Sequence, residues 1–174
     1  MALSLYDFTV SSYLQIMNGI PALLAKGRAH CEKTGRDPDE LVRARIHADM
    51  LPLSFQIDSV VHHSLGALRG VQEGVFTPPN PLPDPTLKDL ENLVTGALDE
   101  LKQYTPESVA PLATKDLEFR MGDFKLPFDG TGFLSSFSLP NFYFHATTTY
   151  DILRKEGVPL GKRDFLNRLK LKGG

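Results

Sequence analysis

The sequence predicts a mostly α-helical single domain, an antiparallel four-helix bundle with a small β-hairpin before its last helix. Apolar residues recur at helical spacing in four segments of useful length. Around residues 117–128 that spacing changes to two, which is typical of strands. The 174 residues, 41% of them hydrophobic, are enough for one substantial core, so residues 1–174 are treated as one domain.

The first two helices are predicted from apolar periodicity and from a capping signal. Residues 5–30 place their apolar side chains on one face. The stretch 37–40 then combines an N-cap acid, a proline and a glutamate, so a second helix is expected to begin there and to run to about residue 70. Because a proline removes a backbone donor, Pro52 is expected to kink this helix near Asp49.

The third helix follows a stiff connection. Residues 74–85 contain five prolines and are expected to form a rigid loop. Asp84 and Pro85 then form a second capping signal, and the leucine-rich stripe from Leu87 to Leu101 is the clearest amphipathic pattern in the chain.

A hairpin and a fourth helix complete the expected fold. Gly122 and Asp123 fit a two-residue turn between strands, and Pro127 is expected to lie on an edge strand, where its missing N–H costs no ladder bond. The fourth helix is expected over about residues 131–155. The tail of residues 158–174 is basic, and a solvated end is favoured over a nucleic-acid or lipid patch.

Composition excludes several classes of function. The net charge of −2 provides no basic field for nucleic acid, and the single cysteine, Cys31, can form no internal disulfide. No apolar run reaches the roughly 18–20 residues of a membrane helix, and the N-terminus lacks a secretory signal. We therefore expect a soluble, cytoplasmic protein without membrane or nucleic-acid partners. No P-loop, nucleophile elbow or HExxH motif is present.

Polar side chains lie at helical spacing within the apolar helices, most clearly in PNFYFHATTTY at residues 140–150. Side chains three, four or seven residues apart share one helix face, so two of these faces can meet across a pocket. The predicted pocket consists of Asn141, His145 and Thr148 on the fourth helix, Asp49, Gln56 and His63 on the second, and Tyr6 and Tyr13 on the first.

Two interpretations of His145 remain open. It lines a functional pocket, or it is a core histidine that hydrogen-bonds a neighbouring helix. His62 and His63 form no paired ligand, because adjacent helical residues diverge by about 100°. One of the two must point away from the pocket, and His62 is expected at the surface.

Three stretches resemble one family. LSLYD at residues 3–7, DMLPL at 49–53 with Gln56, and the long segment LPNFYFHATTTYDILRKEGVPLGKRDFL are similar to domain-of-unknown-function family nineteen-ninety-three. The resemblance covers nearly the whole chain and implies the DinB/YfiT-like superfamily of four-helix bundles. That superfamily includes metalloenzymes, thiol-dependent transferases and maleylpyruvate isomerases, and its members are often homodimers.

The resemblance also implies where a metal would be bound. The superfamily holds its metal with a histidine on the second helix and an H/E-x-x-x-H pair on the fourth, which places His145 and Asn141 at the paired positions. The second-helix position falls on Gln56 or on Asp49. A neutral carboxamide is a poor ligand for zinc, iron or nickel, so we expect no bound metal and no other cofactor.

The expected function is therefore that of a metal-independent enzyme of isomerase, cyclase or lyase type acting on a small molecule. His145 would move a proton, with Asp49 as its catalytic partner, and the other polar residues of the pocket would bind the substrate. One alternative is a divergent metalloenzyme with a divalent transition metal. Another is a non-catalytic binding or dimerisation module. A homodimer is expected in each case.

Overall fold

The computed structural model describes residues 3–169 and 171–172, and this part of the chain is mostly helical with a small three-stranded sheet. The first helical segment comprises α1 (Leu5–Phe8), α2 (Val10–Met17) and α3 (Ile20–Thr34). Ser4 caps it through a capping box, and Gly35 ends it with a φ of +70°, a conformation that suits glycine.

The second helical segment begins later than the sequence suggests. A short 3₁₀ helix, η1 (Pro38–Arg43), follows the Asp37 cap, and residues 44–52 are not helical. α4 (Leu53–Val61) begins directly after Pro52, which is its N-cap in an extended conformation. The predicted kink at Pro52 is therefore wrong. The residue before a proline disfavours helical backbone, so Pro52 starts a helix instead of bending one.

One π-helical turn lies within this second segment. α4 continues through η2 (His62–Gly66) into α5 (Ala67–Glu73), and Gly74 ends the segment with a φ of +80°. A π-helical turn rotates the side chains after it relative to those before it, and such turns are frequent at functional sites. Both histidines at positions 62 and 63 lie in this turn.

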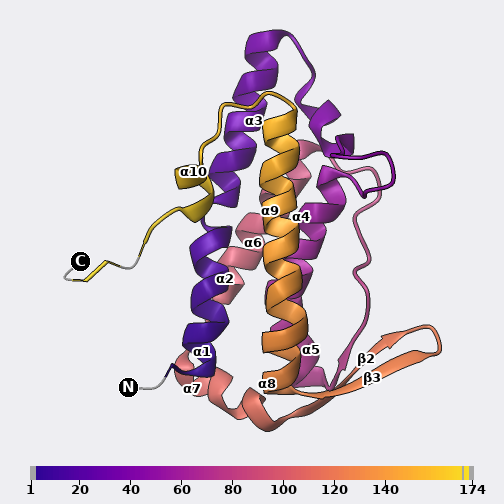
Figure 1. The fold of residues 1–174 in the computed structure, drawn as a ribbon, viewed down its shortest axis with the longest axis vertical. Coiled ribbons are helices and arrows are strands. Elements are labelled where there is room, and N and C mark those ends of the chain that lie inside the picture. Colours follow the sequence, from indigo (N-terminus) through magenta and orange to yellow (C-terminus); the bar gives the residue numbers. More distant parts are fainter. Residues whose placement is uncertain (1–2, 170, 173–174) are drawn as a thin grey trace.

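The third long helix, α6 (Leu87–Leu101), runs in the same direction as the second segment. Near its start the Leu87 N–H donates to Asp39 at 2.7 Å, and near its end Glu100 pairs with Arg69 of α5. The chain first forms β1 (Val75–Phe76) and then crosses back along the molecule through residues 77–86 (Figure 1). The predicted antiparallel order is therefore wrong for this pair.

The hairpin is confirmed and gains a third strand. α7 (Pro106–Val109) and η3 (Ala110–Thr114) lead into β2 (Asp116–Met121) and β3 (Phe124–Asp129), which pair antiparallel. β1 pairs with β2 in parallel, so the order is β1-β2-β3. β3 is an edge strand, as Pro127 predicted.

The last long segment consists of α8 (Gly130–Gly132), the π-helical η4 (Phe133–Ser138) and α9 (Leu139–Lys155). α9 packs along α4, and both also contact the first segment or α6 (Figure 1). α10 (Lys162–Leu166) returns to α3, where Asp164 pairs with Lys26 at 2.7 Å. Part of the predicted basic tail, including Lys170, lies outside the described residues.

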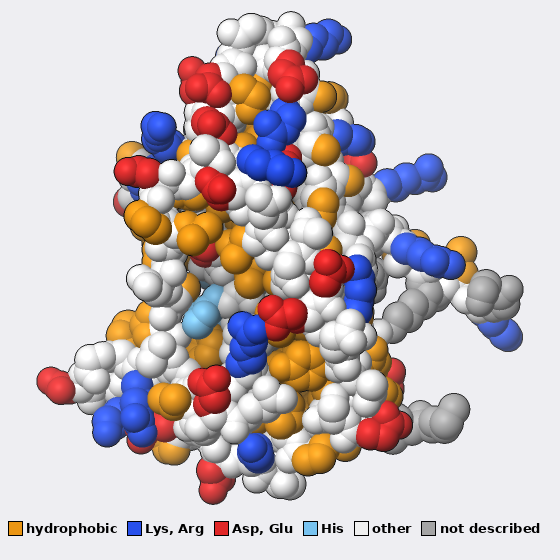
Figure 2. Space-filling view, turned by 180° about the vertical axis from the view of Figure 1, so that it is seen from behind, with side chains coloured by type: hydrophobic (Ala, Val, Ile, Leu, Met, Phe, Trp, Pro, Cys, Tyr) orange, Lys and Arg blue, Asp and Glu red, His pale blue; other side chains and the backbone are white. Residues whose placement is uncertain are grey.

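The core lies between these helical segments, and its largest fully buried side chains include Tyr13, Phe133 and Phe142. On the face shown in Figure 2, acidic and basic side chains are interspersed among hydrophobic ones, and a histidine lies in a depression. Among the described residues, no helix combines the length and the apolar character needed to span a bilayer.

Candidate functional site

His145 of α9 and Gln56 of α4 form the polar contact between these two helices. Nδ1 of His145 lies 2.8 Å from Oε1 of Gln56, and Nε2 of Gln56 donates to the Leu51 carbonyl at 2.9 Å. The NH₂ group of Gln56 donates to the Leu51 carbonyl, so the side-chain oxygen of Gln56 is the atom that faces His145 and accepts from it. The network thus assigns the neutral Nδ1–H tautomer to His145 and leaves a lone pair on its Nε2.

His63 lies beside His145. Their ring centroids are 5.7 Å apart and their planes differ by 11°. The side chain of His63 is only 7% exposed, and among the described residues its Nδ1 has no hydrogen-bond partner. His63 follows Gln56 by seven residues, and both side chains contact His145 of α9. The structure therefore brings together three of the predicted site residues.

Aromatic rings surround the two imidazoles. Phe55 and Phe144 flank His145 at centroid distances of 6.0 and 5.2 Å, and Phe137 lies 5.8 Å from His63. This apolar environment disfavours the charged form. Burial lowers the pKa of His145 to about 4, with a smaller contribution from His62, and it lowers the pKa of His63 to about 3. Both rings are neutral at pH 7.

A chain of hydroxyl groups supports the π-helical turn from the first segment. The hydroxyl of Tyr13 lies 3.0 Å from Ser138 Oγ, which donates to the His63 carbonyl at 2.6 Å. Tyr13 is fully buried, and burial raises its pKa. Tyr13 therefore reaches the site through the backbone of His63, and its role there is to fix position.

Two predicted residues of α9 use their side-chain donors within their own continuous helical segment, which includes η4 and α9. Asn141 Nδ2 donates to the Phe137 carbonyl at 2.7 Å, and Thr148 Oγ1 donates to the Phe144 carbonyl at 2.8 Å. Such bonds to the carbonyl four residues earlier are common for short polar side chains in helices. Neither side chain is bonded to Gln56 or His145 in the part of the chain that the structure describes.

Asp49 and Tyr6 lie elsewhere. Asp49 is in the non-helical residues 44–52, where its side chain is 82% exposed and contacts His47. The expectation that it shares a helix face with Gln56 is wrong, because the helix begins only after Pro52. Tyr6 is on α1, which packs against α7 and η3.

Sequence reasoning missed one buried acid. Asp58 of α4 is 9% exposed, and among the described residues its Oδ2 has no hydrogen-bond partner. Burial raises its pKa to about 6, partly offset by the backbone N–H of Leu82. The available signal was a carboxylate inside the apolar stretch QIDSVV, where a charge is costly to bury.

The residues around His145 do not suit a transition metal. The donors at hand are two imidazoles and the oxygen of Gln56, which already accepts from His145. Zinc sites use three or more Cys, His, Asp or Glu ligands. Within residues 3–169 and 171–172, no three such side chains gather closely enough to hold a metal ion.

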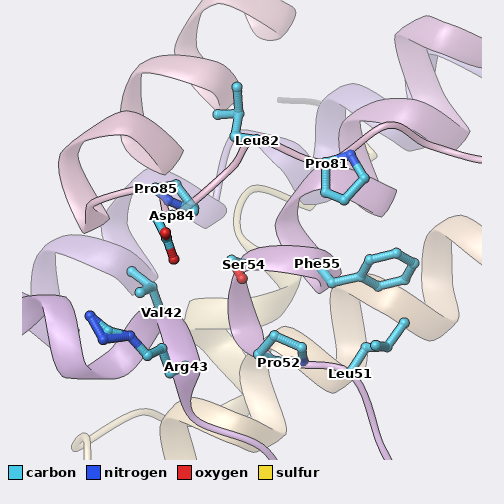
Figure 3. A pocket seen from close by; sticks show the side chains of 10 residues that line it. All are labelled: Val42, Arg43, Leu51, Pro52, Ser54, Phe55, Pro81, Leu82, Asp84 and Pro85. Atoms are coloured by element: carbon cyan, nitrogen blue, oxygen red, sulfur yellow. The ribbon is translucent and has the colours of Figure 1, made fainter.

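A hollow opens on the other side of Phe55. It has a volume of about 300 Å³ and lies between η1, the start of α4 and the crossover of residues 77–86. Figure 3 shows Asp84 descending from the crossover toward Val42 and Ser54, with Leu51 and Phe55 at the opposite rim. Leu51 and Phe55 also contact the Gln56–His145 pair, so this hollow and the imidazole site share one wall.

Comparisons with known proteins agree with this architecture. A family model described as "Domain of unknown function (DUF1993)" matches residues 5–166. A crystal structure of a DinB family member protein from Shewanella denitrificans is similar, with a TM-score of 0.80 and 26% sequence identity over 98% of this chain and 96% of that chain. No curated protein matches.

Proposed function

The chain belongs to the DUF1993 family, and from this premise we propose that it is a four-helix-bundle protein that binds a small molecule and transforms it by proton transfer at His145. The reaction would be of isomerase, cyclase or lyase type and would need no metal. The observation that carries the proposal is the hydrogen-bond chain from Leu51 through Gln56 to His145. This chain orients the His145 ring through Nδ1 and does not use Nε2.

The electrostatics of the site keep the imidazole neutral and make it a weaker base than an ordinary histidine, so the proton that it takes must be an acidic one. Burial keeps the pKa of His145 at about 4, so its Nε2 is an acceptor throughout the neutral range. An imidazolium formed there by taking a proton from substrate would be a strong acid. It would return the proton readily, as an isomerisation or an elimination requires. Gln56 would keep the ring in one tautomer during both steps.

The surroundings of His145 support a small and partly apolar substrate. Phe55 and Phe144 flank the ring, and α9 carries Phe144 with 56% of its surface exposed. An aromatic rim with one polar acceptor is a common arrangement in small-molecule sites. The hollow beyond Phe55 offers further volume for the body of such a substrate.

One observation favours a non-catalytic module instead. The Leu51–Gln56–His145 chain is internally satisfied, and such a chain can serve only to fasten α4 to α9. The two functions predict different stabilities. A structural imidazole leaves Gln56 unpaired when it is removed, which costs about 1–3 kcal/mol, whereas removal of a catalytic group often costs little.

The test is the variant His145→Ala, with Gln56→Met as a second probe. Turnover of small unsaturated acids and carbonyl compounds would be screened with the wild-type protein, and chemical denaturation would measure the free energy of unfolding. We expect His145→Ala to abolish turnover and to change the unfolding free energy by less than about 1 kcal/mol. Retained turnover, or loss of about 3 kcal/mol with no activity found in the wild type, would sink the proposal.

A further inference from the structure

A second hollow lies on a different face of α4 from Gln56. It has a volume of about 200 Å³ and is bounded by the second helical segment, α6 and the beginning of the crossover. At roughly 30 Å³ per water, it could hold the volume of about six or seven water molecules. Its lining includes the acid Asp58, the apolar side chains of Val61, Leu65 and Leu93, and Pro79 and Asn80 of the crossover.

Asp58 is the unusual group in this hollow. Its side chain is more than nine-tenths buried, it lines the space, and its Oδ2 has no hydrogen-bond partner in the part of the chain that the structure describes. Among the described residues, the backbone N–H of Leu82 is the one group that offsets the effect of burial on this carboxylate. A buried carboxylate without a countercharge costs several kcal/mol, and a cationic ligand placed against it would recover part of that cost.

The neighbouring side chains do not neutralise Asp58. His62 Nε2–H donates to the Thr77 carbonyl at 2.7 Å, and burial lowers the pKa of His62, so the ring is neutral at pH 7. Arg69 also lines the hollow, and its guanidinium pairs with Glu100 of α6. Of the residues that line the hollow, these three are the titratable or charged ones.

We propose that this hollow binds a small molecule through a protonated amine. The ammonium group pairs with the carboxylate of Asp58, and a short aliphatic body lies against Leu65 and Leu93. His62 supplies a second acceptor, since Thr77 uses its Nε2–H and leaves a lone pair on Nδ1. Position 66 contributes as well, because a Cβ at Gly66 would lie 3.2 Å from that Nδ1.

The experiment is an NMR titration of the full chain with n-butylammonium at pH 8, with n-butanol and butyrate as matched probes. Saturable shifts of backbone amides are expected around residues 58–66 and at Asn80 with butylammonium alone. Asp58→Asn preserves the shape and removes the charge, and it should weaken binding at least tenfold. Asp99→Asn removes an exposed carboxylate that pairs with Lys102, and it should leave the affinity unchanged.

Gly66→Ala provides an independent variant, because it narrows the hollow and leaves Asp58 intact. It should also weaken butylammonium binding. The proposal is overturned by equal binding of butanol, by unchanged affinity in Asp58→Asn, by shifts centred on His145, or by no saturable shift with butylammonium. None of these results depends on whether His145 has an activity.

The pH dependence of binding is a further check. Because burial raises the pKa of Asp58 to about 6, the carboxylate is protonated at pH 5 in about nine of ten molecules. Butylammonium should therefore bind about tenfold more weakly at pH 5 than at pH 8. An affinity that is the same at both values would contradict the role of Asp58.

Discussion

At the residue scale, the site is defined by imidazoles held neutral in an apolar environment. His63 and His145 have ring centroids 5.7 Å apart, and burial lowers the pKa of each. The two differ in their bonding, since His145 has Gln56 as a partner and His63 Nδ1 has none among the described residues. A buried nitrogen without a partner costs stability, so His63 is kept at an energetic cost.

This cost depends on pH in a defined direction. An unfolded histidine binds a proton below about pH 6.5, whereas His63 in the folded protein does so only near pH 3. The unfolded state therefore binds more protons between these values, and stability falls as the pH falls through this window. At pH 5 the loss due to His63 is about 2 kcal/mol.

The variant His63→Phe tests this linkage. Its free energy of unfolding should fall by about 2 kcal/mol less than that of the wild type between pH 7 and pH 5, because the phenyl ring binds no proton. Urea denaturation at the two pH values measures both drops. The part of the drop in unfolding free energy that is due to His145 remains in the variant, because His145 is unchanged there. Equal drops in the two proteins would show that His63 is not buried as described.

At the element scale, the crossover and the small sheet hold the parallel pair of helical segments in place. β1 pairs with β2, and α5 packs directly on β1. The contact is close at Gly70, where a Cβ would lie 2.9 Å from Phe76 Cδ2 and 3.1 Å from the Val75 carbonyl oxygen. Glycine at this position lets a helix approach a strand backbone.

Gly70 and Gly96 form a matched pair for a test of this contact. Gly70→Ala should destabilise the protein by about 1–3 kcal/mol through overpacking. Gly96 lies on the exposed side of α6, where an added Cβ would meet nothing within 4 Å, so Gly96→Ala should stabilise the protein by about 0.5–1 kcal/mol through helix propensity. Thermal and urea denaturation measure both. Stabilisation by Gly70→Ala would contradict the close packing of α5 on β1.

At the scale of the whole molecule, exposed aromatic residues are concentrated on two of the long segments. Phe8 of α1 is 40% exposed, and Tyr143 and Phe144 of α9 are 38% and 56% exposed. α2 and α9 are neighbours, so these segments belong to adjacent parts of the molecule. We propose that a second copy of the chain covers this surface and forms a homodimer.

Light scattering on the purified protein tests the homodimer. The mass should be twice that of the chain at micromolar concentration, and Phe144→Glu should reduce it to the monomer by placing a charge at the contact. Phe124→Glu changes an equally exposed phenylalanine on the hairpin, 52% exposed, and should leave the dimer intact. A monomeric wild-type protein, or two variants with the same mass, would end this proposal.

Local patterns were sufficient for most elements. The apolar stripe of α6, the alternation of β2 and β3, and the edge position of Pro127 are all read from neighbouring residues, because periodicity and turn chemistry act over a few positions. The sequence predicted that His145 and Gln56 face one another on neighbouring helices, but it did not predict their direct hydrogen bond, because Asp49 was the expected partner of His145. The resemblance to the DUF1993 family was confirmed over residues 5–166.

The tertiary structure decided where α4 begins, in which direction the helical segments run relative to one another, and which polar atoms are buried. A proline at position 52 is compatible with a kink within a helix or with the start of one. Because α4 begins after Pro52, Asp49 lies outside the helix and away from the site. The proline-rich crossover made the second and third segments parallel, which no local pattern specifies. Burial left Nδ1 of His63 and an oxygen of Asp58 without hydrogen-bond partners among the described residues. Each of these depends on contacts between residues far apart in the chain, where packing energy outweighs local propensity.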